Sequence, residues 1–189
     1  MTNAQQRGRR TLLLITAIFA APILLAAYMY FSGSTWRPAE STQYGELVSP
    51  PRTLPDINLL TDAEDKPLYG IWNLLVLADA QCDPACTQSL ENIRQIRLSL
   101  GPKMTRLQTV FVPAASSAIA PDLANNHPAL IIVDPTTSQD LRGIVGDYSN
   151  GQIFIVDPLG NLMMQYAPGT LMGDIRKDLG HLLQLSGIG

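Results

Sequence analysis

The stretch LVLADAQCDPACTQSLENIRQI, residues 75–96, contains both cysteines of this 189-residue chain. It begins inside an apolar run, WNLLVLA at 72–78, whose length and near-continuous apolarity indicate a central β-strand covered on both faces. It ends in a helical pattern, because Leu90, Ile93 and Ile96 share one face of a helix. The two cysteines are therefore expected at a junction between a strand and a helix.

The helix is expected to begin between the cysteines. Asp83 is a favourable N-cap and Pro84 is favoured at the first helical position, so Cys82 falls just outside the helix and Cys86 in its first turn. A thiolate at this end is stabilised by the helix dipole, and the thiolate is both nucleophile and metal ligand. The pair is a candidate redox or metal site, with a purely structural disulfide as the alternative. Closing so short a loop would contribute only about 2 kcal/mol.

The flanking segments alternate between strand and helix patterns. A strand at 105–112 completes a β-α-β unit with parallel strands. The later segments comprise a strand, a short helix, a hairpin around DPLGN and a closing helix, at 129–133, 136–144, 152–166 and 170–185. This order predicts an α/β, thioredoxin-like fold with a β-hairpin and a C-terminal helix.

Residues 11–31 predict one transmembrane helix at the N-terminus. They carry no charge, and 21 helical residues at about 1.5 Å each span a bilayer core. Arg7, Arg9 and Arg10 precede this segment, which places the N-terminus in the cytoplasm by the positive-inside rule. A cleaved signal peptide is the alternative, but its apolar core would be shorter. In both cases the rest of the chain is exported.

The predicted organisation is a cytoplasmic N-terminus at 1–10, a transmembrane helix at 11–31, a Pro- and Ser-rich linker at 32–53 and an exported domain at 54–189. The three arginines before the helix leave ten Lys and Arg after it against all 16 Asp and Glu, a net charge of −6. This acidity argues against a nucleic-acid partner. Export permits the cysteines to form a disulfide.

The cysteine motif CDPAC and the hairpin IFIVDPLGNLMMQY resemble those of the Sco/SenC family, and the anchor, the linker and the segment HPALIIVDPTTSQDL follow in the family's order. The resemblance implies a membrane-anchored, thioredoxin-like protein of the inner membrane whose domain lies in the periplasm. It implies work on the copper centre of cytochrome c oxidase, with an oxidase subunit or another copper chaperone as partner. Copper is the implied candidate metal, held by Cys82 and Cys86.

The chain departs from the family at two positions of the copper site. The family's copper-binding histidine falls at Ser149, and the family's proline after the second cysteine is Thr87. His127 is expected at the opposite sheet edge from the cysteines, and His181 on a solvated helix face with Asp174, Lys177 and Asp178. The chain therefore reads as a divergent member that lacks the ligand histidine.

Three polar residues before the hairpin strand, Asp147, Tyr148 and Asn150, are candidates to orient a thiol, because that strand begins near the active helix in thioredoxin-like folds. Met163 and Met164 could in principle bind Cu(I), but alternate strand residues face opposite sides, and core packing is the simpler interpretation.

Three functions remain open from the sequence. The first is thiol–disulfide exchange, in which Cys82 attacks and Cys86 resolves the mixed disulfide. The second is a carrier that passes Cu(I) through the same two sulfurs. The third is a non-catalytic assembly factor with a structural or relic disulfide.

Overall fold

The computed structural model describes residues 3–31, 42–59, 66–79 and 81–187. The chain divides into two compact units, Met1–Thr42 and Gln43–Gly189. In the first unit, helix α1 (Asn3–Phe31) includes Arg7–Phe31, the one helix among the described residues that is long and apolar enough to cross a membrane. The helical segment thus begins earlier than the predicted boundary at residue 11.

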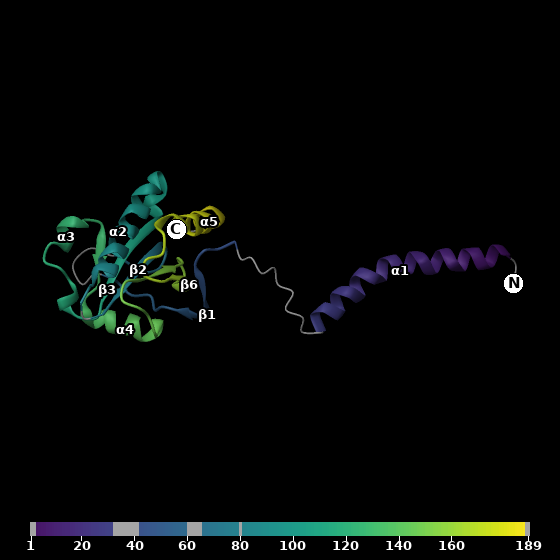
Figure 1. Cartoon of the computed structure of the whole chain (residues 1–189), viewed down its shortest axis with the longest axis horizontal. Coiled ribbons are helices and arrows are strands. Elements are labelled where there is room, and N and C mark those ends of the chain that lie inside the picture. The colour runs from purple at the N-terminus through teal and green to yellow at the C-terminus, as the bar shows by residue number, and fades with distance from the viewer. Residues whose placement is uncertain (1–2, 32–41, 60–65, 80, 188–189) are drawn as a thin grey trace. The chain divides into compact units, whose positions relative to one another are not determined.

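The second unit contains a six-stranded mixed sheet in the order β1-β6-β5-β2-β3-β4 (Figure 1). Its strands are β1 (Glu46–Thr53), β2 (Trp72–Ala78), β3 (Leu107–Pro113), β4 (Leu130–Ile132), β5 (Gln152–Val156) and β6 (Asn161–Tyr166). The helices are α2 (Pro84–Ser99), α3 (Leu123–Asn126), α4 (Pro135–Val145) and α5 (Met172–Leu185), with 3₁₀ turns at Gly101–Arg106 and Ser116–Ala118. The predicted α/β, thioredoxin-like fold is confirmed.

The central strand β2 contributes side chains to two hydrophobic cores, one on each face of the sheet. All seven of its residues are buried, and alternate side chains feed opposite faces. Leu74 and Val76 join a core under α2 and α5, whereas Leu75 and Leu77 join a second core under α4. The β2-α2-β3 unit is parallel as predicted, and β5 pairs with β2 antiparallel.

Strand β1 differs from the sequence interpretation, which placed 32–53 in a linker. Residues 32–41 lie outside the described part of the chain, but Glu46–Thr53 pair antiparallel with β6 and belong to the sheet. The strand lies at the sheet edge and changes register between Leu47 and Arg52, around its two prolines. An edge position tolerates proline because one side of the strand needs no ladder bonds. The folded domain therefore begins well before the predicted boundary at Leu54.

Candidate functional site

A disulfide joins Cys82 and Cys86 where β2 leads into α2, with a Cα–Cα distance of 5.2 Å. Asp83 is the N-cap of α2 and Pro84 its first residue, so the helix begins between the cysteines as predicted. The carboxylate Oδ1 of Asp83 accepts a hydrogen bond from the backbone N–H of Cys86 at 2.8 Å. The motif thus folds locally through a cap that is built from its own residues.

The two sulfur-bearing residues differ in accessibility. Cys86 has no exposed surface and belongs to the core under α2, whereas Cys82 is half-buried at the margin of that core. The Sγ of Cys82 lies 3.9 Å from the hydroxyl of Thr87. Thr87 is the position at which the Sco/SenC resemblance implied a proline. A partner molecule from outside can therefore approach Cys82 and not Cys86.

The helix terminus at the disulfide is less favourable to a thiolate than the sequence suggested. The dipole and the free N–H groups of a helix N-terminus stabilise an anion. Here one of those N–H groups, that of Cys86, is already bonded to Asp83, and the Asp83 carboxylate adds a negative charge next to Cys82. Asp83 therefore counteracts part of the stabilisation that the helix would give to a thiolate.

Among the three polar candidates before β5, Asn150 forms hydrogen bonds with the backbone of the cysteine loop. Its side-chain oxygen accepts from the N–H of Asp79 at 3.1 Å, and its side-chain nitrogen donates to the carbonyl of Gln81 at 2.9 Å. Because these two residues lie just before Cys82, the Asn150 amide holds together the loop that presents the exposed sulfur. Asn150 contacts no sulfur in these bonds, so it positions the loop.

Tyr148 interacts with Asp79, at the start of the same loop, and with Arg142 of α4. The Tyr148 hydroxyl accepts a hydrogen bond from Nε of Arg142 at 2.6 Å, and burial raises the pKa of Tyr148. Asp147 lines a surface hollow together with Arg52 and Val145. Tyr148 thus lies between the cysteine loop and α4, whereas Asp147 lies near Arg52 of β1.

Gly151 lies against the backbone of Cys86 in the first turn of α2. Its N–H donates to the carbonyl of Leu77 at 2.8 Å, and its φ of +81° lies in the left-handed region. A Cβ at this position would lie 2.5 Å from Cα of Cys86. Only glycine allows the loop before β5 to approach the first turn of α2 this closely.

His127 precedes β4, whose first residue is level with Leu74 of β2, so it lies toward the sheet end opposite the cysteines, in agreement with the sequence expectation. It is the C-cap of the short helix α3, and it lines one part of a hollow that Cys82 also lines. This hollow of about 390 Å³, here called the Cys82 hollow, is lined among others by Gln81, Cys82, Leu90, Asp122, Leu123 and His127. His127 also lines a second hollow together with Leu90, Arg94 and Leu98 of α2.

The described residues contain no group of three His, Cys, Asp or Glu side chains that could hold a metal ion. Ser149 lies at the position that the Sco/SenC resemblance assigns to a copper-binding histidine, and its backbone N–H donates to the side-chain oxygen of Gln152. Met164 is buried in the core and Met163 packs against it, in agreement with core packing. The soft donors at this site are thus the two sulfurs, whose thiolate forms are of the class that suits Cu(I).

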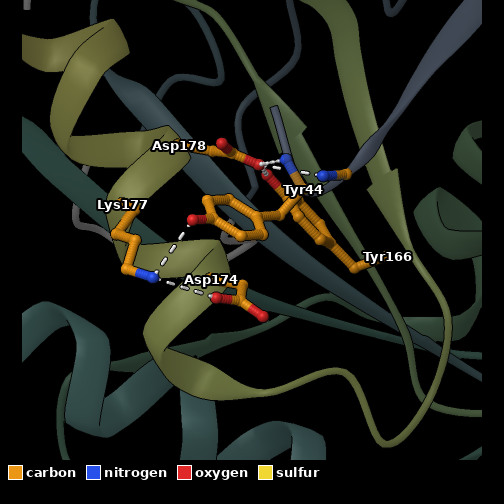
Figure 2. A network of polar contacts seen from close by, with 6 residues as sticks. Tyr44, Tyr166, Asp174, Lys177 and Asp178 are labelled. Atoms are coloured by element: carbon orange, nitrogen blue, oxygen red, sulfur yellow. Dashed lines mark hydrogen bonds and ion pairs between the residues drawn. The ribbon is translucent and has the colours of Figure 1, made fainter. Parts of the chain in front are cut away.

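A buried carboxylate on α5 escaped the sequence analysis. Asp178 was assigned to a solvated face with His181, but Asp178 is only 4% exposed, whereas His181 is exposed. Its Oδ2 accepts from the N–H groups of Tyr44 and Gly45, both at 2.9 Å, and from the hydroxyl of Tyr166 at 3.0 Å (Figure 2). The spacing offered a signal, because Asp178 lies three residues after the buried Ile175.

The Asp178 cluster, formed by Tyr44, Gly45, Tyr166 and Asp178, fixes the start of the folded unit. Burial and the negative charge of Asp178 raise the pKa of Tyr166, so its hydroxyl stays protonated and donates. On the exposed side, Lys177 donates to the hydroxyl of Tyr44 at 3.2 Å and lies over its ring (Figure 2). The residues just before β1 are therefore bonded to the C-terminal helix.

Comparison with known proteins agrees with this architecture. Among solved structures, Sco1 from Thermus thermophilus is similar with a TM-score of 0.59 and 20% identity, over 76% of this chain and 99% of that chain. Copper-bound yeast Sco1 gives a TM-score of 0.51 and 12% identity, over 76% and 90% of the two chains. At these identities the likeness establishes the fold, and the predicted Sco-like fold is confirmed. No curated protein matches the sequence.

Two family descriptions match the sequence itself. Residues 3–33 match the one described as "Transmembrane-like, N-terminal domain". Residues 72–186, more than half of the chain, match the one described as "Transmembrane-like, thioredoxin-like, C-terminal domain". With its apolar N-terminal helix and its thioredoxin-like domain, the chain belongs to this transmembrane-like, thioredoxin-like family.

Proposed function

We propose that this chain is a membrane-anchored, Sco-like thiol protein that exchanges disulfides through Cys82 and Cys86 during biogenesis of the copper centre of cytochrome c oxidase. The observation that carries the proposal is the unequal burial of the two residues, with Cys82 half-buried and Cys86 fully buried at the start of α2. A structural disulfide needs no accessible sulfur, whereas exchange needs one accessible and one protected sulfur.

The reaction proceeds in two displacements. The Cys82 thiolate attacks one sulfur of a partner disulfide, the partner S–S bond breaks, and the released partner thiolate takes a proton from water. The Cys86 thiolate then attacks the Cys82 sulfur of the mixed disulfide and releases the second partner thiol. Two electrons pass from the Cys82–Cys86 dithiol to the partner, and the reverse sequence oxidises a partner dithiol.

The membrane orientation is part of the proposal. Arg7, Arg9 and Arg10 at the start of the apolar span support a cytoplasmic N-terminus and an inner-membrane location. The thioredoxin-like domain would then lie in the periplasm, where disulfides form and persist. The partner proposed for it is an oxidase subunit or another copper chaperone.

Single cysteine variants test the direction of attack. We expect the full-length Cys86→Ser chain, in a neutral detergent, to accumulate a mixed disulfide with 2-hydroxyethyl disulfide, because Cys82 remains reachable and cannot be resolved. The Cys82→Ser chain keeps only the buried sulfur and should react at least tenfold more slowly. Intact-mass measurement over time follows both. Equal rates in the two variants would contradict the assigned roles.

The reduction potential distinguishes exchange from a structural bond. For the full-length wild-type chain, a value between about −120 and −270 mV lies in the range of working oxidoreductases. A value below about −300 mV is typical of structural disulfides and would favour the non-catalytic assembly factor instead.

A second candidate function is transfer of Cu(I), with the ion as cargo. Yeast Sco1, which shares this fold, was solved with copper bound, and the reduced Cys82 and Cys86 supply two thiolates. We expect the reduced full-length chain to bind one Cu(I) against a competing chromophoric chelator, and Cys86→Ser to abolish this binding. Copper bound with unchanged affinity by Cys86→Ser would exclude the two-sulfur site.

A further inference from the structure

The Cys82 hollow opens beside the sulfur that a partner must reach. Its base includes Leu90 and Leu123, which belong to the core under α2, and its rim includes Gln81, Asp122 and His127. Successive residues of an extended chain are only about 3.4 Å apart. When a partner cysteine joins Cys82, the side chain next to that cysteine therefore comes within reach of this hollow.

The charge around the hollow has one sign. The described residues that line it include the exposed Asp122 and neither lysine nor arginine. Asp83, also exposed, follows Cys82 directly, and among the described residues neither aspartate forms an ion pair with a basic side chain. The polar contacts of these carboxylates are to neutral groups, Asn126 for Asp122 and the Cys86 N–H for Asp83. Their negative charges therefore remain available to a partner.

We propose that the Cys82 hollow receives the partner residue next to the reacting cysteine and favours a cationic one. The substrate class is thus a protein segment in which lysine or arginine adjoins the reactive cysteine. This inference rests on the exchange reaction proposed above and specifies its substrate. A cation within about 7 Å of one such carboxylate in water is favoured by roughly threefold, and an anion is disfavoured to a similar extent.

Small disulfides of similar length and different charge test the preference. The pre-reduced full-length chain, in a neutral detergent at pH 8 and low salt, is mixed in separate reactions with cystamine, 2-hydroxyethyl disulfide and 3,3′-dithiodipropionate. Each probe is reduced to two thiols while Cys82 and Cys86 form their disulfide, so loss of protein thiol measures the rate. The quantity compared is the rate with cystamine divided by the rate with dithiodipropionate.

The variants Asp122→Asn and Asp83→Asn remove the charges with little change of shape, and asparagine is as good an N-cap as aspartate. Within one variant the same thiolate attacks both probes, so its own reactivity cancels in the ratio. The intrinsic reactivity of each probe is the same for every variant, so it cancels when the ratios of two variants are compared. We expect the ratio to fall by up to about ninefold in Asp122→Asn, the product of the two threefold effects, and further in the double variant. Added salt should lower the wild-type ratio in the same direction.

Asp140→Asn is the matched control, since Asp140 is exposed on α4, which covers the opposite face of the sheet. Its ratio should equal that of the wild type. The inference is overturned if the Asp122→Asn, Asp83→Asn double variant keeps the wild-type ratio, or if Asp140→Asn lowers it equally. Failure of all three probes to oxidise the reduced chain would instead overturn the exchange function itself, and this inference with it.

Discussion

Replacement of Gly151 by alanine is expected to lower the free energy of unfolding by about 3 to 4 kcal/mol. A non-glycine residue in the left-handed region costs roughly 1 to 2 kcal/mol. The added Cβ would lie 2.5 Å from Cα of Cys86 and 2.8 Å from its backbone nitrogen. Backbone atoms cannot rotate away as a side chain can, so overpacking adds about 1 to 3 kcal/mol. Urea titration of the full-length chain in a neutral detergent, followed by near-UV circular dichroism, measures the loss.

Gly169 provides the control for the contact. Its φ of +85° matches that of Gly151, but a Cβ there would meet no heavy atom within 4 Å. Gly169→Ala should therefore show only the conformational cost, about 1 kcal/mol. Asparagine tolerates the left-handed region, so Gly151→Asn should remain worse than Gly169→Asn. Equal losses at the two positions would refute a close approach of the loop to Cys86.

Replacement of Asp178 by alanine is expected to destabilise the domain by about 3 to 5 kcal/mol. The change leaves three donors without their acceptor, namely the N–H groups of Tyr44 and Gly45 and the hydroxyl of Tyr166. A buried donor that loses its partner costs about 1 to 3 kcal/mol. Asp178→Asn keeps an acceptor oxygen of the same shape and should cost less, about 1 to 2 kcal/mol. The same urea titration measures both.

A second carboxylate on the same helix serves as comparison. Asp174 pairs with the exposed Lys177 at 3.3 Å, and exposed pairs contribute little, so Asp174→Ala should cost no more than about 1 kcal/mol. A double-mutant cycle between Asp178→Ala and Tyr166→Phe should show coupling, because the hydroxyl and the carboxylate share one bond. If Asp178→Ala costs no more than Asp174→Ala, the Asp178 cluster is not what fixes the start of the domain.

The sequence predicted the elements whose local signals agree with their surroundings. In three segments the local sequence preference agrees with the role of the segment in the overall fold. These segments are the buried run of β2, the Asp83 cap with Pro84, and the DPLGN turn. The position of the disulfide followed from these signals. The placement of Cys82 just before the helix and of Cys86 in its first turn followed as well, whereas their unequal burial was found in the structure.

The incorrect predictions concern residues whose structure is determined by tertiary contacts and not by the local sequence. Strand β1 contains two prolines and no alternation, and it is a strand only because β6 offers an edge. Asp178 is polar, yet three donors from distant segments make its burial favourable.

The register of the sheet gives the domain two unlike ends. Gln152 opposes Leu77, Tyr166 opposes Ile153, and Glu46 opposes Gln165, so β1 begins at the same end at which β2 ends. The described residues just before β1 thus lie at the cysteine-bearing end of the domain. The DPLGN turn, with the exposed Leu159, lies at the other end. A fluorophore or affinity tag attached at Leu159 would leave the cysteine-bearing end sterically free.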